Sequence, residues 1–335
     1  MTEEYSVWNG VKFEVGDVDS LSATPINSGS DGEIYENVKA LNGFTRSPSL
    51  SQGDMDEWRI MLLGRRGAGK SSAGNTILGC HTFNTDMQLA RVTQFCEKVQ
   101  GNIDGRPVAV IDTPGLNKAK CMEKEVIRDI LKSVSLYKPG PHVFLLVLPV
   151  GNLTKEDKDM HKLIENMFGK SIWMYTIVLF THGDRLEGKT PNDIIASSDK
   201  DLRDFIRKCS GGFLFFNNKN MEDRAQVTKL LEKIETLVAI NGRGCYTTEL
   251  YPPAERKIRE RQEKILEERQ EEILRKEREL AENFYDKEDL EKQKQELWRE
   301  EEEEARNQAE VQQKRKVSLG KAHSFSTTKL AAISK

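Results

Sequence analysis

The chain has few aromatic residues, 7% of its 335 positions, and it has no apolar run long enough to cross a bilayer. The longest runs, such as HVFLLVLPV at 142–150, have the length of buried strands. The five cysteines form no CxxC pair, and no two histidines have ligand spacing. These absences argue against a disulfide framework and against a metal site built by the protein alone. The N-terminus also lacks the basic flank and apolar core of a signal peptide, so we expect a cytoplasmic protein with reduced thiols.

The overall charge is close to balanced. A formal net charge of -3 gives no electrostatic reason to expect a nucleic-acid partner. Hydrophobic residues make up 37% of the chain, which is low for a fully packed protein of this length. The composition therefore predicts a packed core region joined to solvated segments.

Composition divides the chain into four regions. Residues 1–55 are rich in Ser, Gly, Asn and Asp and predict a flexible acidic tail. Residues 56–245 alternate short apolar runs with amphipathic stretches, the pattern of a mostly parallel sheet with helices on both faces. The apolar runs lie at 58–64, 106–112, 142–150, 174–180 and 212–217.

The C-terminal part is highly charged. Residues 246–316 consist mainly of strong helix formers with a thin apolar stripe, and NFYDKED at 283–289 predicts a break between two helices. Three arrangements fit this pattern: a coiled coil, a helix packed on the globular domain, or a solvated single helix. Residues 317–335 carry no acids and predict a basic flexible tail.

One segment carries a strong phosphate-binding signal. GRRGAGKS at 64–71 fits G-x-x-x-x-G-K-[ST], with a strand before it and a helical pattern after it. Glycines let the backbone curl so that its N–H groups face phosphate oxygens. The Lys70 ammonium would reach the β- and γ-phosphates, and the Ser71 hydroxyl would bind Mg²⁺. The predicted nucleotide contacts in this loop are Gly64, Arg65, Arg66, Gly67, Ala68, Gly69, Lys70, Ser71 and Ser72.

Three further residues are expected around the last phosphate. Asp112 ends the strand in VIDTPG and would hold Mg²⁺ through water, while the Gly115 N–H would bond the γ-phosphate. Between the two motifs, Thr93 is the best candidate for a switch threonine that completes the Mg²⁺ shell. The expected metal ligands are therefore Ser71, Thr93 and Asp112. The groups expected to act on the reacting phosphate are Lys70, Ser71, Thr93 and Gly115.

A second set of residues predicts the base. In FTHGD, Asp184 follows an apolar strand, and its carboxylate can accept hydrogen bonds from guanine N1–H and N2–H₂. Adenine offers no such pair of donors and would leave the charge unpaired. His182 could stack on the base, and Asn217 and Asn218 could border it. The sequence therefore predicts GTP/GDP and Mg²⁺ as ligands, with an adenine-specific module as a less favoured reading.

The motifs together resemble one family. GRRGAGKSSAGNTILG, VTQFC, VIDTPGLN, the box at 149–169, LFTHGD and FNN make residues 57–244 similar to the AIG1-type GTPases, the GTPases of immunity-associated proteins. The resemblance implies a Ras-like P-loop G domain. It also implies dimers or oligomers of this chain, or heterodimers with related GTPases, when GTP is bound. Assembly on intracellular membrane surfaces is a further implication.

Two residues depart from what such a GTPase uses for hydrolysis. Leu116 stands where a water-positioning Gln often follows the Asp-x-x-Gly turn. Asn152 stands where the family often has an Arg that reaches a partner's phosphates. We therefore expect a GTP-dependent assembly switch or scaffold with weak intrinsic hydrolysis. The alternative is an active GTPase that dimerisation stimulates.

Overall fold

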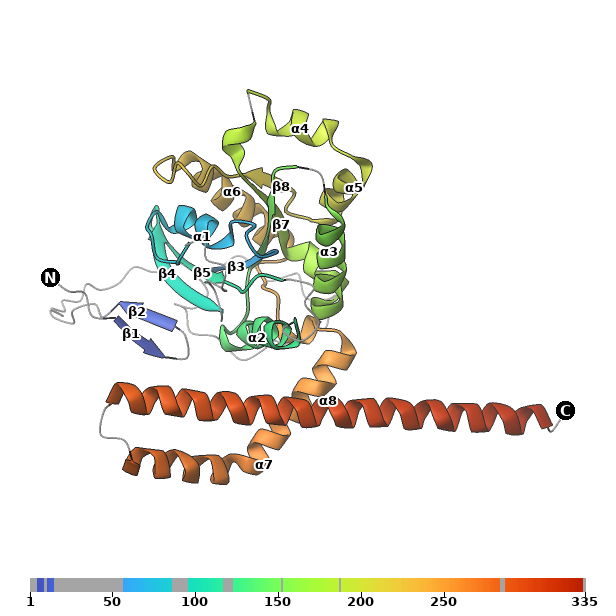
Figure 1. Ribbon diagram of the computed structural model, residues 1–335. Helices are drawn as coiled ribbons and strands as arrows, with labels where there is room; N and C mark the ends of the chain where they lie inside the picture. Colours follow the sequence, from blue (N-terminus) through green and yellow to red (C-terminus); the bar gives the residue numbers. More distant parts are fainter. Residues whose placement is uncertain are drawn as a thin grey trace, which may run out of the picture.

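The computed structural model describes residues 5–8, 11–14, 57–85, 96–116, 123–151, 153–186, 188–283 and 287–333. Its centre is an eight-stranded sheet with the order β1-β2-β4-β5-β3-β6-β7-β8 (Figure 1). The strands are β1 (Tyr5–Trp8), β2 (Val11–Glu14), β3 (Trp58–Leu63), β4 (Glu97–Ile103), β5 (Arg106–Asp112), β6 (Val143–Pro149), β7 (Thr176–Thr181) and β8 (Phe213–Phe215).

The five central strands are parallel, from β5 through β3, β6 and β7 to β8. Their near-continuous apolar sequences are buried on both faces, as a parallel sheet between two helical layers requires. One face is covered by α1 (Lys70–Leu78) and α6 (Ala225–Ile240). The other is covered by α2 (Glu123–Leu136), α3 (Lys155–Phe168) and α5 (Lys200–Lys208). The remaining short helices are η1 (Lys170–Tyr175), η2 (Gly183–Arg185), α4 (Pro191–Ser197) and η3 (Thr248–Leu250).

This arrangement confirms the predicted fold class of a mostly parallel α/β sheet with helices on both faces. Each of the five predicted apolar runs contains a strand. The edge of the sheet adds a feature that the sequence did not predict. β1 and β2 form an antiparallel hairpin inside the expected N-terminal tail, and Val11 pairs with Lys98 of β4. Tyr35, which follows Glu33 and Ile34 in EIYENV, lies outside the described residues.

The C-terminal extension consists of two long helices, α7 (Pro253–Asn283) and α8 (Lys287–Ile333). The two helices meet at the predicted break, and α8 runs back along α7 (Figure 1). A small apolar cluster of Ile265, Ala305 and Ala309 lies between them. Ion pairs add to the contact, because Glu301 of α8 is buried between Arg269 and Lys276 of α7. α8 also continues as a helix through residues 317–333, which the sequence predicted to be a flexible tail.

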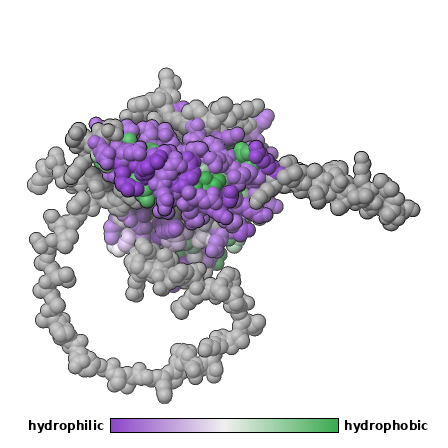
Figure 2. All heavy atoms as spheres, turned by 90° about the horizontal axis from the view of Figure 1, so that it is seen from below, coloured by the Kyte–Doolittle hydropathy of each residue, from purple (hydrophilic) through white to green (hydrophobic). Residues whose placement is uncertain are grey.

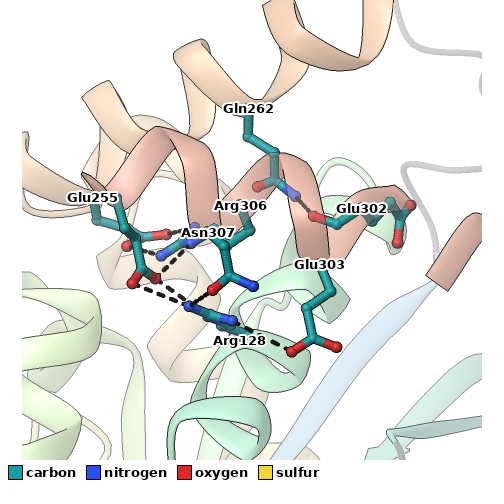
Figure 3. Close-up of polar contacts among 8 residues, drawn as sticks. Arg128, Glu255, Gln262, Glu302, Glu303, Arg306 and Asn307 are labelled. Atoms are coloured by element: carbon teal, nitrogen blue, oxygen red, sulfur yellow. Dashed lines mark hydrogen bonds and ion pairs between the residues drawn. The ribbon is translucent and has the colours of Figure 1, made fainter. Parts of the chain in front are cut away.

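The two-helix extension contacts the G domain at α2. Arg128 of α2 donates to Asn307 at 2.9 Å and to Glu310 at 3.2 Å, both on α8 (Figure 3). The Tyr251 hydroxyl, just before α7, donates to the Leu131 carbonyl of α2 at 2.8 Å. The extension is therefore packed on the globular domain. We call α7 and α8 together the helical arm.

The outward side of the helical arm is largely hydrophilic. Figure 2 shows the molecule from below, with the arm in front and only scattered hydrophobic residues on its surface. Leu274 and Val311 are the large apolar side chains of the arm among the exposed hydrophobic residues, at 40% and 47% exposure. Among the described residues, no helix has the length and apolar content that crossing a membrane would require.

Candidate nucleotide-binding site

The phosphate-binding loop joins β3 to α1 at the carboxyl edge of the sheet. Gly64 sits against β6 so closely that a Cβ there would lie 2.6 Å from the Val147 carbonyl oxygen. Gly67 and Gly69 have φ values of 72° and 92°, in the region that favours glycine. The glycines therefore allow the curled backbone that the sequence predicted for this loop. The loop leads into the N-terminus of α1, whose N–H groups are available to an anion.

Lys70 is the charged side chain at the floor of this loop. It is 7% exposed, and its ammonium donates to the Arg65 carbonyl oxygen at 3.2 Å. Burial lowers the pKa of Lys70, and the Asp112 carboxylate acts in the opposite direction. A second anion near this ammonium would offset the burial, so the loop is electrostatically suited to a phosphate.

Ser71 and Asp112 form the candidate metal site. The Ser71 hydroxyl donates to Asp112 Oδ2 at 2.6 Å, and Asp112 is 1% exposed at the end of β5. Asp112 Oδ1 accepts from the Thr113 N–H at 3.0 Å, which fixes the carboxylate. Hydroxyl and carboxylate oxygens beside a phosphate site fit Mg²⁺, which keeps several waters and binds few protein groups directly. Thr93, the third predicted metal ligand, lies outside the described residues.

The turn after β5 contacts the phosphate-binding loop. Gly115 packs on Arg66, because a Cβ at Gly115 would lie 2.5 Å from the Arg66 Cα. The next residue, Leu116, donates its N–H to the Gly64 carbonyl at 3.1 Å and is 3% exposed. Its side chain belongs to the apolar cluster beneath α2 and α3. Leu116 therefore fills the core and offers no polar group to a hydrolytic water.

Arg65 and Arg66 lie differently in the loop. Arg65 Nε is 3.5 Å from Asp157 Oδ1 in the first turn of α3, while Arg66 is exposed. Asp157 also accepts from Thr154 in a capping box at the start of α3. The predicted 149–169 box is thus joined to the phosphate-binding loop by an ion pair. Asn152 of this box lies outside the described residues.

The predicted base-reading residues follow β7 and β8 on the same edge. The Thr181 hydroxyl at the end of β7 donates to the Ala68 carbonyl of the phosphate-binding loop at 2.9 Å. His182 adopts φ 62°, and Gly183 donates its N–H to the Phe216 carbonyl at 2.8 Å. These contacts turn the chain and place Asp184 in η2, with its side chain 23% exposed.

Asn217 and Asn218 lie next to Asp184. The Asn217 N–H is held by Gln226 Oε1 at 2.9 Å, and Asn218 Oδ1 accepts from the Thr76 hydroxyl of α1 at 3.0 Å. Asn218 is therefore tied to the helix that begins at the phosphate-binding loop. Ser72 is in the same helix, and its carbonyl accepts from the Thr76 hydroxyl at 2.9 Å.

Sequence reasoning missed one contact of Asp184. The Lys219 ammonium lies 2.7 Å from Asp184 Oδ2 and lowers the pKa of that carboxyl. Lys219 directly follows Asn217 and Asn218, which the sequence did indicate as residues near the base. Its place beside them is the sequence signal that could have identified it. The predicted site residues that the structure describes end or follow β3, β5, β7 and β8 of the sheet, while Thr93 lies outside the part described.

Known proteins resemble the G-domain part of the chain. Human GTPase IMAP family member 8 is 36% identical over 188 residues, covering 56% of this chain and 27% of the human protein. Immune-associated nucleotide-binding protein 10 from Arabidopsis thaliana is 35% identical over 231 residues, covering 67% of this chain and 49% of that protein. The chain thus matches less than half the length of these two relatives.

A solved structure with a similar arrangement is that of Toc33 from Arabidopsis thaliana in complex with GDP and Mg²⁺. It is 21% identical, has a TM-score of 0.46, and covers 58% of this chain and 89% of that chain.

The family comparison covers the sheet, the helices around it and the first part of α7. The family model described as AIG1 matches residues 58–269, which is more than half of the chain. This chain therefore belongs to the AIG1 family.

Proposed function

We propose that this chain binds GTP and GDP with Mg²⁺ and acts as a GTP-dependent dimerisation or oligomerisation switch with weak intrinsic hydrolysis. One observation carries the proposal: a phosphate-binding loop, the Ser71–Asp112 pair and Asp184 share one edge of a parallel sheet. The loop N–H groups and Lys70 would hold the phosphates. Ser71 and Asp112 would hold Mg²⁺, with Thr93 as the proposed third ligand.

The weak-hydrolysis part of the proposal rests on Leu116 and Asn152. The buried Leu116 cannot position a water molecule, and Asn152 carries no charge to offset a transition state. A second subunit would have to supply what is missing. The alternative function, a GTPase stimulated by homo- or heterodimerisation, is favoured by the exposed Arg66 beside Gly115.

The switch part of the proposal rests on α2. This helix follows the Gly115 turn along the chain, and its Asp129 carboxylate accepts the Cys96 N–H at 2.9 Å. Cys96 lies three positions after Thr93 in the sequence. The same helix carries the contacts to the helical arm. Ordering of the Gly115 and Thr93 segments by GTP would therefore act on α2. Through α2 it would act on the helical arm, which would serve as the output of the switch or as an additional oligomer contact.

The choice of base is tested at Asp184. We expect Asp184→Ala to lower GDP affinity by roughly 10–100-fold, since a carboxylate that accepts two N–H groups is lost. ADP affinity should change little, so that guanine selectivity falls. Competition of unlabelled GDP and ADP against a fluorescent GDP analogue measures both. Asp193→Ala on α4 is the matched carboxylate control. Unchanged selectivity in Asp184→Ala would exclude Asp184 as the guanine reader.

A further inference from the structure

Asp184, the carboxylate proposed to read guanine, forms an ion pair with a lysine of this chain. Lys219 Nζ lies 2.7 Å from Asp184 Oδ2, close enough for a charge-assisted hydrogen bond. The two residues come from different loops, Asp184 from the turn after β7 and Lys219 from the turn after β8. This ammonium offers the carboxylate the same kind of donor that guanine would offer, an N–H group.

The loop that carries Lys219 is held in place by its neighbours. The Lys219 N–H donates to Asn217 Oδ1 at 3.1 Å, while Gln226 binds the Asn217 N–H and also donates to the Asn220 carbonyl at 2.8 Å. The backbone on both sides of Lys219 is therefore fixed next to Asp184. The side chain itself is 76% exposed, so it can leave Asp184 without unpacking the core.

We infer that Lys219 is an internal competitor for the guanine-reading carboxylate, occupying Asp184 in the empty protein and leaving it when guanine binds. This inference rests on the proposed guanine site. Guanine would bring N–H donors to both oxygens of the carboxylate, so one of its N–H groups would compete with the Lys219 ammonium for Oδ2. The pair therefore reduces guanine affinity.

The inference predicts that GDP affinity rises when the positive charge of Lys219 is removed. Lys219→Ala should bind GDP about 2–5-fold more tightly than the parent chain, because an exposed ion pair that binding has to break is removed. Simple attraction between a lysine and the phosphates would predict weaker binding instead. Lys219→Arg keeps the pair and should retain the parent affinity. Lys229→Ala, an exposed lysine on α6, is the matched control and should not tighten binding.

Calorimetric titration of the full chain with GDP and Mg²⁺, at low and high salt, provides the test. The gain in Lys219→Ala should shrink toward onefold as salt screens the pair in the parent chain. Equal or weaker GDP binding by Lys219→Ala at low salt would overturn the inference. The proposed function would still stand if Asp184→Ala loses guanine selectivity in the same assay. A parent chain that does not bind GDP would overturn both.

Discussion

Replacing Lys70 with methionine is expected to weaken GTP binding by roughly 100-fold or more. The ammonium would make hydrogen bonds to charged phosphate oxygens, each worth about 1.5–3 kcal/mol, and every 1.4 kcal/mol is tenfold in affinity. Methionine keeps the apolar stem of a side chain that is 7% exposed, so the loop retains its packing. Fluorescent GTP titration in Mg²⁺ measures the loss.

The same substitution should not destabilise the empty protein. Burial lowers the pKa of Lys70, which means that the folded state disfavours its charge. Removing that charge should leave the melting temperature equal or higher, while the stabilisation that added GTP gives the parent chain disappears. Lys229→Met on α6 serves as the exposed control. If Lys70→Met bound GTP within tenfold of the parent, the loop would not be the phosphate site.

Arg306→Ala is expected to loosen α8 from α7 and, through Glu310, to weaken the contact of α8 with α2. Arg306 is 8% exposed at the side chain and holds Glu255 with two hydrogen bonds of 2.7 Å (Figure 3). It also contacts Glu310, the acceptor of Arg128 on α2. Removing Arg306 leaves the largely buried Glu255 carboxylate without its arginine, while Glu310 keeps Arg128. The cost to the packing of the arm is about 2–4 kcal/mol.

Limited proteolysis measures this loosening. The arm of Arg306→Ala should be cut at least tenfold faster than that of the parent chain, while the G domain stays resistant. The exchange of both charges, Arg306→Glu with Glu255→Arg, should restore part of the protection. Arg299→Ala is the control, since that side chain is 52% exposed and pairs with Glu296 within its own helix. Equal cleavage rates in Arg306→Ala and Arg299→Ala would show that this ionic contact does not hold α8 against α7.

The parts of this structure that local chemistry dictates could be predicted from the sequence. The glycines of 64–69, the buried strands and the Asp112 and Asp184 positions each follow from short-range rules. Two strands form at Tyr5–Trp8 and Val11–Glu14, within a polar N-terminal region. Backbone pairing between them and with the edge of β4 stabilises these strands, and composition does not reveal such pairing. The sequence showed that Leu116 stands where a Gln often does. Only the structure shows that its side chain is buried in the core with residues of α2 and α3.

Contacts between distant segments were beyond sequence reasoning. The helical pattern of residues 254–316 left a coiled coil and docking on the globular domain equally open, with a solvated single helix as a third option. The choice depends on Arg128 meeting Asn307 and Glu310, residues about 180 positions apart. Lys219 similarly looks like an ordinary surface lysine until the β7 and β8 turns bring it to Asp184. Charge pairs of this kind have no periodicity that a sequence pattern could reveal.

The most direct test of the switch measures molar mass by light scattering as protein concentration rises, with GDP or with GTP and Mg²⁺. Phosphate release is followed in the same samples. We predict a monomer with GDP and at least twice that mass with GTP, while turnover per chain stays near zero at every concentration. Turnover that climbs with concentration would favour the dimer-stimulated GTPase. A mass that does not change with GTP would contradict the proposed assembly switch.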